Sequence, residues 1–358
     1  MIQSSFDFLL LSLLSIPFSY VNYLFLIESI KPLTPLIQQA CRRLQDLSSL
    51  DIRYTYSLIA KLNSFPCSVT KLYEEVFKDA FGSVLMASLL GATTTAVAVL
   101  SVEAGRKHAY RIQALVVPII LLSGNTIGIS VILPLVWIPL NGITQYMNRY
   151  KNSSYHNYIH PFRVLAIMAA VIFGQILVSA LPFMAKTPSQ FRTALTILQL
   201  GPIMYSTIEW VCTFLSRSSC FAHDNQQQIT RADAMQSKIF VQQLYMTLTV
   251  TNLILHYGII ANVFLQELNV VQVLASMLRA QPWMTADSTG LNAATLYICI
   301  NLIALVCTFA YWAALDGGLD GLILYGLSCL VLGPGAGLAA YCWVREQSKH
   351  DQYSLGKI

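Results

Sequence analysis

Long apolar runs separated by short polar stretches recur along most of the chain. A helix needs about 20 mostly apolar residues to cross a bilayer. The predicted spans are residues 7–28, 81–101, 112–140, 162–184, 194–216, 239–265, 291–315 and 321–344. The pattern predicts an all-α, polytopic integral membrane protein with about eight transmembrane helices in one bundle, a single domain over residues 1–358. Gly124, Gly128, Pro134 and Pro139 predict a break or tilt in the third run.

The one long connection, residues 29–80, separates the first two predicted spans. Leu36, Ala40, Leu44 and Leu47 recur in it at helical spacing among charged residues, which predicts an amphipathic helix in the membrane interface. A structural loop packed on the membrane domain and a functional lid are the alternatives. The N-terminus lacks the basic region and cleavage site of a signal peptide, which predicts a retained first helix. The basic residues leave the membrane orientation open.

Composition agrees with this class of protein. Hydrophobic residues make up 55% of the chain and charged residues only 11%, against about a quarter in soluble domains. The net charge of +5 is spread over loops and both ends, so no nucleic-acid partner is expected. The eight cysteines form no CxxC pair and most lie in apolar runs, so neither a disulfide framework nor a zinc site is expected.

Glu209 is the one acidic residue that the pattern places clearly inside a predicted span, in PIMYSTIEWVCTFLS. His256 is the one histidine so placed, and no lysine or arginine is predicted at depth. An ionisable group at the bilayer centre costs at least about 2.5 kcal/mol. Without a cationic neighbour, Glu209 is expected to stay neutral and could then donate a proton to an alkene or an epoxide. The alternative is a protonated carboxyl that only joins helices.

Helical spacing groups further polar side chains with these two. Tyr205 and Ser206 can share the face of Glu209, and Trp210 with Phe214 adds aromatic surface. In the next span Tyr245, Thr249, Asn252 and His256 form one polar stripe, which is expected to face another helix or a cavity rather than lipid. A neutral His256 hydrogen-bonded inside the bundle is the structural alternative.

Metal chemistry is not expected. DGGLDG, with Asp316 and Asp320, is typical of a tight turn, and no DDxxD-like cluster that could hold magnesium occurs. Near the C-terminus, Gly333 and Gly337 form a GxxxG face for close helix packing. Pro334 is expected to kink this last span, and Arg345 with Glu346 to mark the water boundary.

Four segments, in order along the C-terminal two-thirds, resemble a family of fungal integral-membrane terpene cyclases of meroterpenoid and indole-diterpene biosynthesis. They are GNTIGISVILPLVWIPL, QFRTALTILQLGPIMYS, LTVTNLILHYG and the ending LGPGAGLAAYCWVRE. The chain departs from the family at the start of the seventh span. An acidic residue is expected there, but the chain reads LNAATLYIC, and the nearest carboxyl is that of Asp287. This departure makes Glu209 the preferred acid.

The resemblance implies a metal-independent cyclase without cofactor, in the endoplasmic reticulum membrane. Its substrate would be a prenylated hydrophobic molecule, often with an aromatic or indole head and a terminal epoxide, supplied by a pathway prenyltransferase and an epoxidase. Glu209 would be the general acid, and His256 or Asn252 would orient it or accept the final proton. Five aromatic residues would bind the substrate and its cations: Tyr205, Trp210, Tyr245, Tyr257 and Trp312.

Two other functions stay open from the residues alone. In a small-molecule or proton-coupled transporter, Glu209 and His256 would be relay groups. In a non-catalytic membrane scaffold, the polar groups would only join helices. Head group, prenyl length, epoxide or alkene protonation, ring pattern and oligomeric state are not readable from the sequence.

Overall fold

The computed structural model describes residues 5–46, 60–106, 109, 111–148, 157–220, 230–265 and 293–349. Within these residues every element is a helix, which confirms the all-α prediction there. Five of the described helices are long and apolar enough to cross a membrane: Leu9–Gln39, Ala80–Gly105, Pro161–Met184, Arg231–Ala261 and Ala293–Leu332. They are compatible with a multi-pass membrane protein, whereas the number of eight spans stays a prediction.

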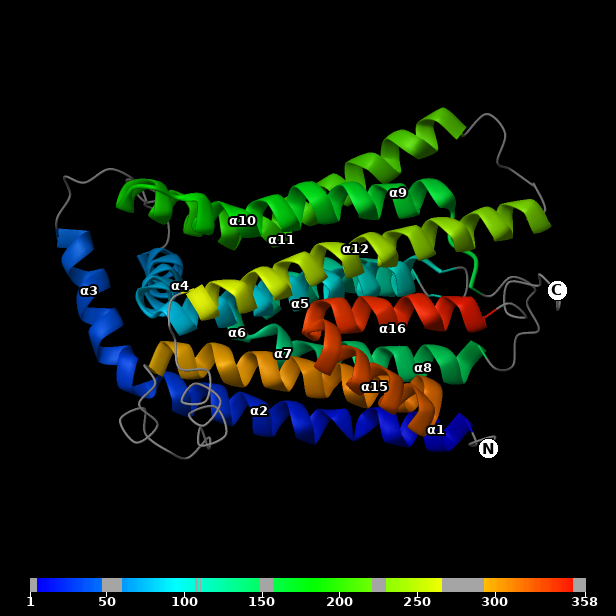
Figure 1. The fold of residues 1–358 in the computed structure, drawn as a ribbon, viewed down its shortest axis with the longest axis horizontal. Helices are drawn as coiled ribbons and strands as arrows, with labels where there is room; N and C mark the ends of the chain where they lie inside the picture. Colours follow the sequence, from blue (N-terminus) through cyan, green and yellow to red (C-terminus); the bar gives the residue numbers. More distant parts are fainter. Residues whose placement is uncertain are drawn as a thin grey trace.

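Most of the helices run side by side along one long axis, with both described ends of the chain at the same end of the bundle (Figure 1). The first half contains α1 Ser5–Leu13, α2 Ser15–Ile30, η1 Lys31–Leu33, α3 Thr34–Asp46, α4 Ala60–Lys78, α5 Ala80–Gly105, α6 Arg111–Ile127, α7 Ile129–Ile132, η2 Leu133–Trp137 and α8 Ile138–Asn148. The second half contains α9 Pro161–Ala169, η3 Ala170–Ile176, α10 Leu177–Met184, α11 Pro188–Cys220, α12 Arg231–Leu265, α15 Ala293–Leu332 and α16 Pro334–Ser348. The predicted span 194–216 falls on α11, which is not one of the five.

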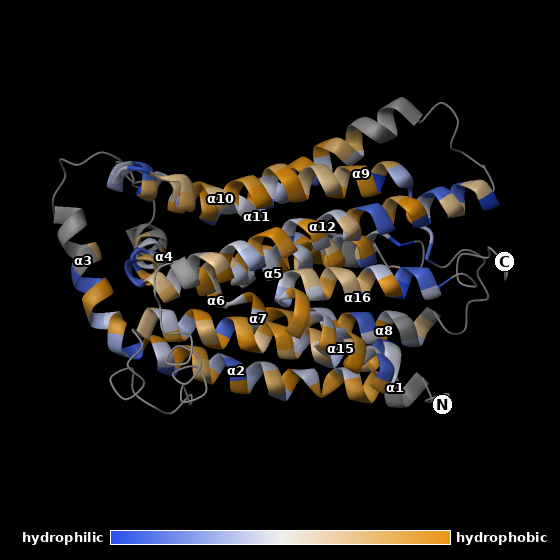
Figure 2. Cartoon of the chain, in the orientation of Figure 1, coloured by the Kyte–Doolittle hydropathy of each residue, from blue (hydrophilic) through white to orange (hydrophobic). Residues whose placement is uncertain are grey.

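Polar side chains face inward and apolar ones outward on the first long helix. The hydroxyl of Ser15 donates to the Pro134 carbonyl at 2.6 Å, and that of Ser19 donates to the Val131 carbonyl at 2.7 Å. On the opposite face, side chains such as Tyr20, which is 62% exposed, point away from the protein. Hydrophobic residues predominate along the helices, and hydrophilic ones gather towards the ends of the bundle (Figure 2). This reversed polarity fits a lipid-facing surface.

The third predicted span is not one helix, because the chain reverses direction at Gly128. Gly128 has φ 115°, a conformation that favours glycine. α6 ends before it, and the α7–η2–α8 run leads back alongside α2. A Cβ on Gly124 would lie 3.2 Å from the Ile129 Cα, so the two arms meet closely beside the turn. The predicted break over 112–140 is confirmed, at Gly128.

The eighth predicted span, 321–344, is also wrong as a single helix. α15 turns at Gly318, which supports the tight-turn interpretation of DGGLDG, and residues 319–332 lead back into the bundle. Gly333, with φ 86°, then reverses the chain, so that Pro334 begins α16 instead of kinking it. Each arm is about 21–22 Å long, shorter than a bilayer core of about 30 Å. The two arms form a helical hairpin that enters and leaves at the same end (Figure 1).

In the described part of the connection 29–80, α3 and α4 lie across one end of the bundle rather than along it (Figure 1). This placement fits the predicted interfacial helix. Ile37 and Cys41 of α3 are buried, whereas Leu36 is 64% exposed. The side chain of Leu44 and all of Leu47 lie outside the described residues.

A disulfide between Cys41 and Cys67 ties α3 to α4. The expectation that no disulfide forms was therefore wrong for this pair. The sequence separation of 26 between the two cysteines matches no short motif, and only the packing of the two helices brings the sulfur atoms together.

We expect the end of the bundle that carries this disulfide to face the non-cytosolic side, because disulfides persist in oxidising compartments. An N-glycosylation acceptor inserted between α3 and α4 should then be glycosylated in microsomes. A matched insertion between α11 and α12, at the opposite end, should not. Glycosylation of the second insertion alone would show the opposite orientation, with the disulfide end of the bundle facing the cytosol.

Candidate active site

Glu209 lies on α11 where this helix faces α5 and α9. Its side chain is 18% exposed. The Ser101 hydroxyl on α5 donates to Oε2 of Glu209 at 3.3 Å. The Tyr205 hydroxyl in turn donates to the Ser101 oxygen at 2.7 Å. Tyr205 is therefore on the predicted face of Glu209, and Ser101 joins the two residues.

The two carboxyl oxygens of Glu209 differ in their hydrogen-bond partners. Oε2 accepts from Ser101, whose own oxygen is held by the fully buried Tyr205. Among the described residues no hydrogen bond is made to Oε1 of Glu209. One oxygen is thus fixed in place by α5, while the other is left for a further partner.

Tyr205 reaches this position because α11 packs closely on η3, a π-helical segment. A Cβ on Gly174 of η3 would lie 2.6 Å from the Tyr205 Cα, so any other residue at 174 would push the helices apart. Short π-helical segments occur often near functional sites. Gly174 therefore allows the close approach of η3 and α11 that places Tyr205 and Glu209 next to α5.

Arg163 overturns the expectation that Glu209 has no cationic neighbour. Its guanidinium Nη2 lies 3.9 Å from Oε1 of Glu209. Arg163 is the third residue of α9, where the apolar pattern suggested only a span boundary. Its long side chain nevertheless carries the charge to the neighbouring helix, as such side chains can. A separation of 3.9 Å is an ion-pair contact but exceeds hydrogen-bond distance.

The other predicted aromatic residues are spread over the bundle. Trp210 is 69% exposed and stacks on Phe214, with ring centroids 5.8 Å apart, on the outer surface of α11. Tyr257 is also exposed, and its hydroxyl donates to the Val331 carbonyl at 3.4 Å. Tyr245 and Trp312 are buried, and their hydroxyl and indole nitrogen make no hydrogen bond within the described residues. Of the five, the structure brings only Tyr205 to Glu209.

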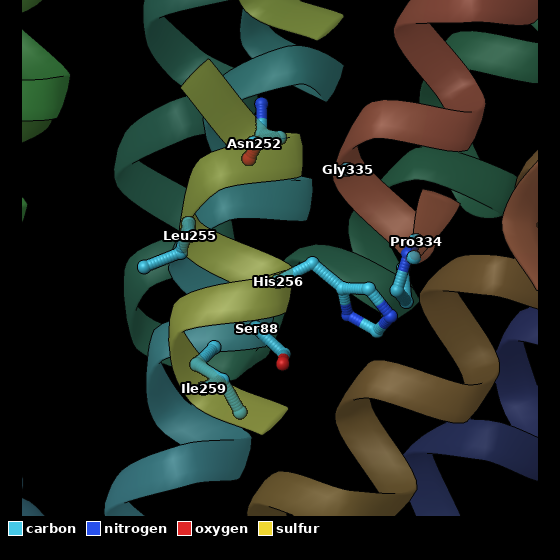
Figure 3. Close-up of a pocket in the computed structure, with 8 residues that line it drawn as sticks. Ser88, Asn252, Leu255, His256, Ile259, Pro334 and Gly335 are labelled. Carbon is cyan, nitrogen blue, oxygen red and sulfur yellow. The ribbon is translucent and has the colours of Figure 1, made fainter. Parts of the chain in front are cut away.

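Asn252 and His256 lie at the tip of the hairpin formed by α15 and α16 (Figure 3). The Asn252 amide donates to the Thr95 hydroxyl at 3.1 Å, and Thr95 donates to the Gly335 carbonyl at 3.1 Å. His256 packs on the turn, where a Cβ on Gly333 would lie 2.5 Å from its Nδ1. The predicted polar stripe of α12 does face other helices.

This second group is distant from Glu209. Ser88 lines the small pocket beside His256, and it precedes Ser101 by thirteen residues on α5. At 1.5 Å per residue, Ser88 lies about 20 Å from Ser101 along α5, and Thr95, which binds Asn252, lies about 9 Å from it. Asn252 and His256 therefore do not contact Glu209.

A buried cluster of ion pairs at the other end of α5 was missed by the sequence pattern. Arg106 donates through Nε to Glu103 at 3.0 Å and also contacts Glu346. Arg345 donates to Glu103 at 2.6 Å and reaches both oxygens of Asp316 at 2.5 and 2.8 Å. All five residues lie at predicted span boundaries. Four of them are nevertheless buried and Asp316 is 14% exposed, because the end of α5, the bend of α15 at Gly318 and the end of α16 converge. The two arginines together with Lys349, which lies 4.0 Å from Asp316, balance the three carboxylates.

These pairs revise two expectations. Glu209 is not the only acid away from water, since Glu103 and Glu346 are more deeply buried. Arg345 and Glu346, which were expected at the water boundary, are buried inside the protein. Asp316 is bound by Arg345, and within the described residues no group of three potential metal ligands occurs.

The sequence contains weak signals for the missed site residues. Ser101 is a polar position in the otherwise apolar stretch AVAVLSVEAG, and Arg163 follows shortly after the Pro161 that begins α9. Neither signal identifies Glu209 as the partner. Asp287 lies outside the described residues.

Comparison with known proteins adds no assignment. No family model, curated protein or solved structure matches this chain. The resemblance to fungal terpene cyclases therefore stays a prediction.

We expect Arg345→Met to destabilise the fold strongly. The substitution leaves Glu103 and Asp316 buried without this partner, and breaking a buried pair costs about 3–5 kcal/mol. Thermal unfolding in detergent measures the loss as a lower apparent Tm. Arg192→Met is the matched control, because Arg192 is 54% exposed in its pair with Glu74 and should lose no more than about 1 kcal/mol. Equal effects of the two variants would contradict the structural role of the cluster.

Proposed function

We propose that this protein is a membrane-embedded, metal-independent terpene cyclase with Glu209 as the general acid. The observation that carries the proposal is the Tyr205–Ser101–Glu209 chain, which holds one carboxyl oxygen and leaves the other without a hydrogen bond among the described residues. This asymmetry suits a general acid, because the hydrogen bond orients the carboxyl through one oxygen while the other can carry the transferable proton towards a substrate. The long apolar helices add a setting suited to a hydrophobic substrate.

The proposed reaction is an isomerisation. Glu209 donates its proton from Oε1 to the epoxide oxygen of a prenyl chain as the carbon–oxygen bond breaks. The π electrons of the neighbouring alkene then form a carbon–carbon bond to the cationic centre. Further ring closures end when the last cation loses a proton, so the product has the composition of the substrate. Protonation of a terminal alkene would start the same sequence.

Arg163 has a defined part in this proposal. After Glu209 gives up its proton, the guanidinium at 3.9 Å stabilises the resulting carboxylate. The distance is long enough that Arg163 does not occupy Oε1 with a hydrogen bond. Arg163 is thus a positioning residue that acts through Glu209. Tyr205 and Ser101 orient the acid, and Asn252 and His256 are not part of this acid site.

The finer features of the proposal follow from the resemblance. The substrate is a prenylated hydrophobic molecule with an aromatic or indole head, supplied by a prenyltransferase and an epoxidase. The protein crosses the endoplasmic reticulum membrane about eight times.

Cyclisation by microsomes from an expressing host tests the function directly. Farnesylated and geranylgeranylated aromatic epoxides are supplied, and products are determined by mass spectrometry and NMR. We expect Glu209→Gln to lower turnover by about 100-fold or more, because the amide has no acidic proton to donate. Tyr205→Phe should lower it by less, since Ser101 remains to orient the carboxyl.

Glu75→Gln is the matched control, since Glu75 lies on α4 in an ion pair with the exposed Lys78, and should leave turnover unchanged. Undiminished cyclisation by Glu209→Gln would refute the acid assignment. Absence of cyclisation by the wild-type protein on every substrate would refute the cyclase itself. Vesicle uptake of a solute that depends on Glu209 would then favour the transporter.

A further inference from the structure

A cleft lies at the end of the bundle that carries the disulfide, between α3, α4, the end of α6 and the start of α15. It encloses a cavity of about 200 Å³. This is smaller than the roughly 300–1,000 Å³ of sites that enclose a drug-sized ligand, so the cleft holds the head and the adjoining part of a longer molecule. Its apolar wall is formed by Ile30, Ile37, Val69 and Leu72.

The polar part of the lining is uncharged. It consists of the hydroxyl and amide side chains of Thr34, Gln38, Ser68, Asn125 and Thr126, together with two phenols, Tyr73 and Tyr297. The Thr34 hydroxyl donates to the Ile30 carbonyl at the end of α2, and the Thr126 hydroxyl donates to the Ser123 carbonyl of its own helix. The Asn125 amide donates to the Gln199 carbonyl at 3.0 Å. These groups are therefore partly engaged by the protein.

The two phenols are available to a ligand. Among the described residues, neither the Tyr73 hydroxyl nor the Tyr297 hydroxyl makes a hydrogen bond, and both side chains line the cleft. Burial raises the pKa of Tyr73 above its ordinary value, and the neighbouring Tyr297 adds to the shift. The cleft thus presents two neutral donors side by side.

Charges near the cleft are bound by one another. Glu74, beside Tyr73 in sequence, pairs with Lys71 and with Arg192. Glu28 and Lys31, beside Ile30, form an exposed pair at the end of α2. Each of these five charged residues has an oppositely charged partner. None of them therefore offers an unpaired charge to a ligand in the cleft.

The cleft also lies at a polarity boundary. The outward side chains Tyr23 and Leu24 of α2 are exposed and apolar in character, whereas the ion pair of Glu28 and Lys31 follows one turn later. A molecule in the cleft would have its polar head at the level of the charged residues and its apolar part towards lipid.

We propose that this cleft binds an uncharged amphipathic molecule whose head accepts hydrogen bonds from Tyr73 and Tyr297 through carbonyl or hydroxyl oxygens. Its apolar chain packs along Ile37, Val69 and Leu72. This binding does not depend on the cyclase reaction, because the cleft contains no residue of the Glu209 site.

The disulfide fixes two walls of the site. Cys41 follows Ile37 and Gln38 by one turn of α3, and Cys67 directly precedes Ser68 and Val69 on α4. Breaking the bond removes the covalent link between these walls. Occupancy of the cleft is therefore expected to fall when Cys41 and Cys67 are both replaced by Ser.

Photolabelling of the full chain in nanodiscs tests the proposal. The probe is a monoacylglycerol with a diazirine and an alkyne in its acyl chain, and labelled peptides are mapped by mass spectrometry. We expect saturable labelling of residues 30–38, 68–73 and 125–126, reduced by excess unmodified monoacylglycerol. The double variant Tyr73→Phe with Tyr297→Phe should weaken apparent affinity roughly tenfold, since two hydrogen bonds are lost.

Val69→Trp fills the cleft and should abolish labelling there, whereas Val250→Trp, at an exposed position on α12, is the matched control and should not. Unchanged thermal unfolding of each variant shows that it remains folded. Labelling spread over the outward helix faces without saturation would overturn the proposal. Preferential labelling of the cleft by a lysophosphatidic acid probe with the same acyl chain would overturn it too. Neither result depends on whether cyclisation occurs.

Discussion

The arrangement of this protein depends on the ion pairs buried where α5, α15 and α16 meet. Arg345 binds Glu103 and Asp316 at once, and Arg106 joins Glu103 to Glu346. Because Arg106, Arg345 and the nearby Lys349 balance the three carboxylates, the end of α5, the bend of α15 at Gly318 and the end of α16 can pack closely. These contacts fix the axial position of α5, and α5 in turn contributes a contact to both Glu209 and Asn252.

Two separate groups of polar side chains contact α5, each at a different position along the helix. Ser101, two residues before Glu103, meets Glu209 of α11. Thr95, about 9 Å further along, meets Asn252 of α12 and the hairpin turn. A shift of α5 along its length would disturb both groups together. The ion-pair cluster thus connects the stability of the fold with the geometry of the acid site.

The helical period and the apolar runs predict those features of the structure that lie within a single helix. The position of Glu209 inside a helix and the shared face of Tyr205 follow from spacing alone. Contacts between helices do not, and so Ser101, Arg163 and the Cys41–Cys67 bond were not predictable. Run length also fails where glycine reverses the chain, because the two arms around Gly128 or Gly333 read as one continuous apolar segment. Residues at the ends of runs were taken as water-exposed, which was wrong wherever several ends converge.

The environment of Glu209 places two opposing demands on an acid. A carboxyl group donates a proton only if it holds one, and a nearby guanidinium disfavours the neutral form. The same guanidinium stabilises the carboxylate that remains after transfer. At 3.9 Å, without a hydrogen bond to Oε1, Arg163 is close enough for the second effect and leaves Oε1 accessible. Ser101 holds Oε2 and receives a hydrogen bond from Tyr205, so the carboxyl cannot rotate Oε1 away without breaking this chain. The three neighbours together therefore determine which oxygen reacts.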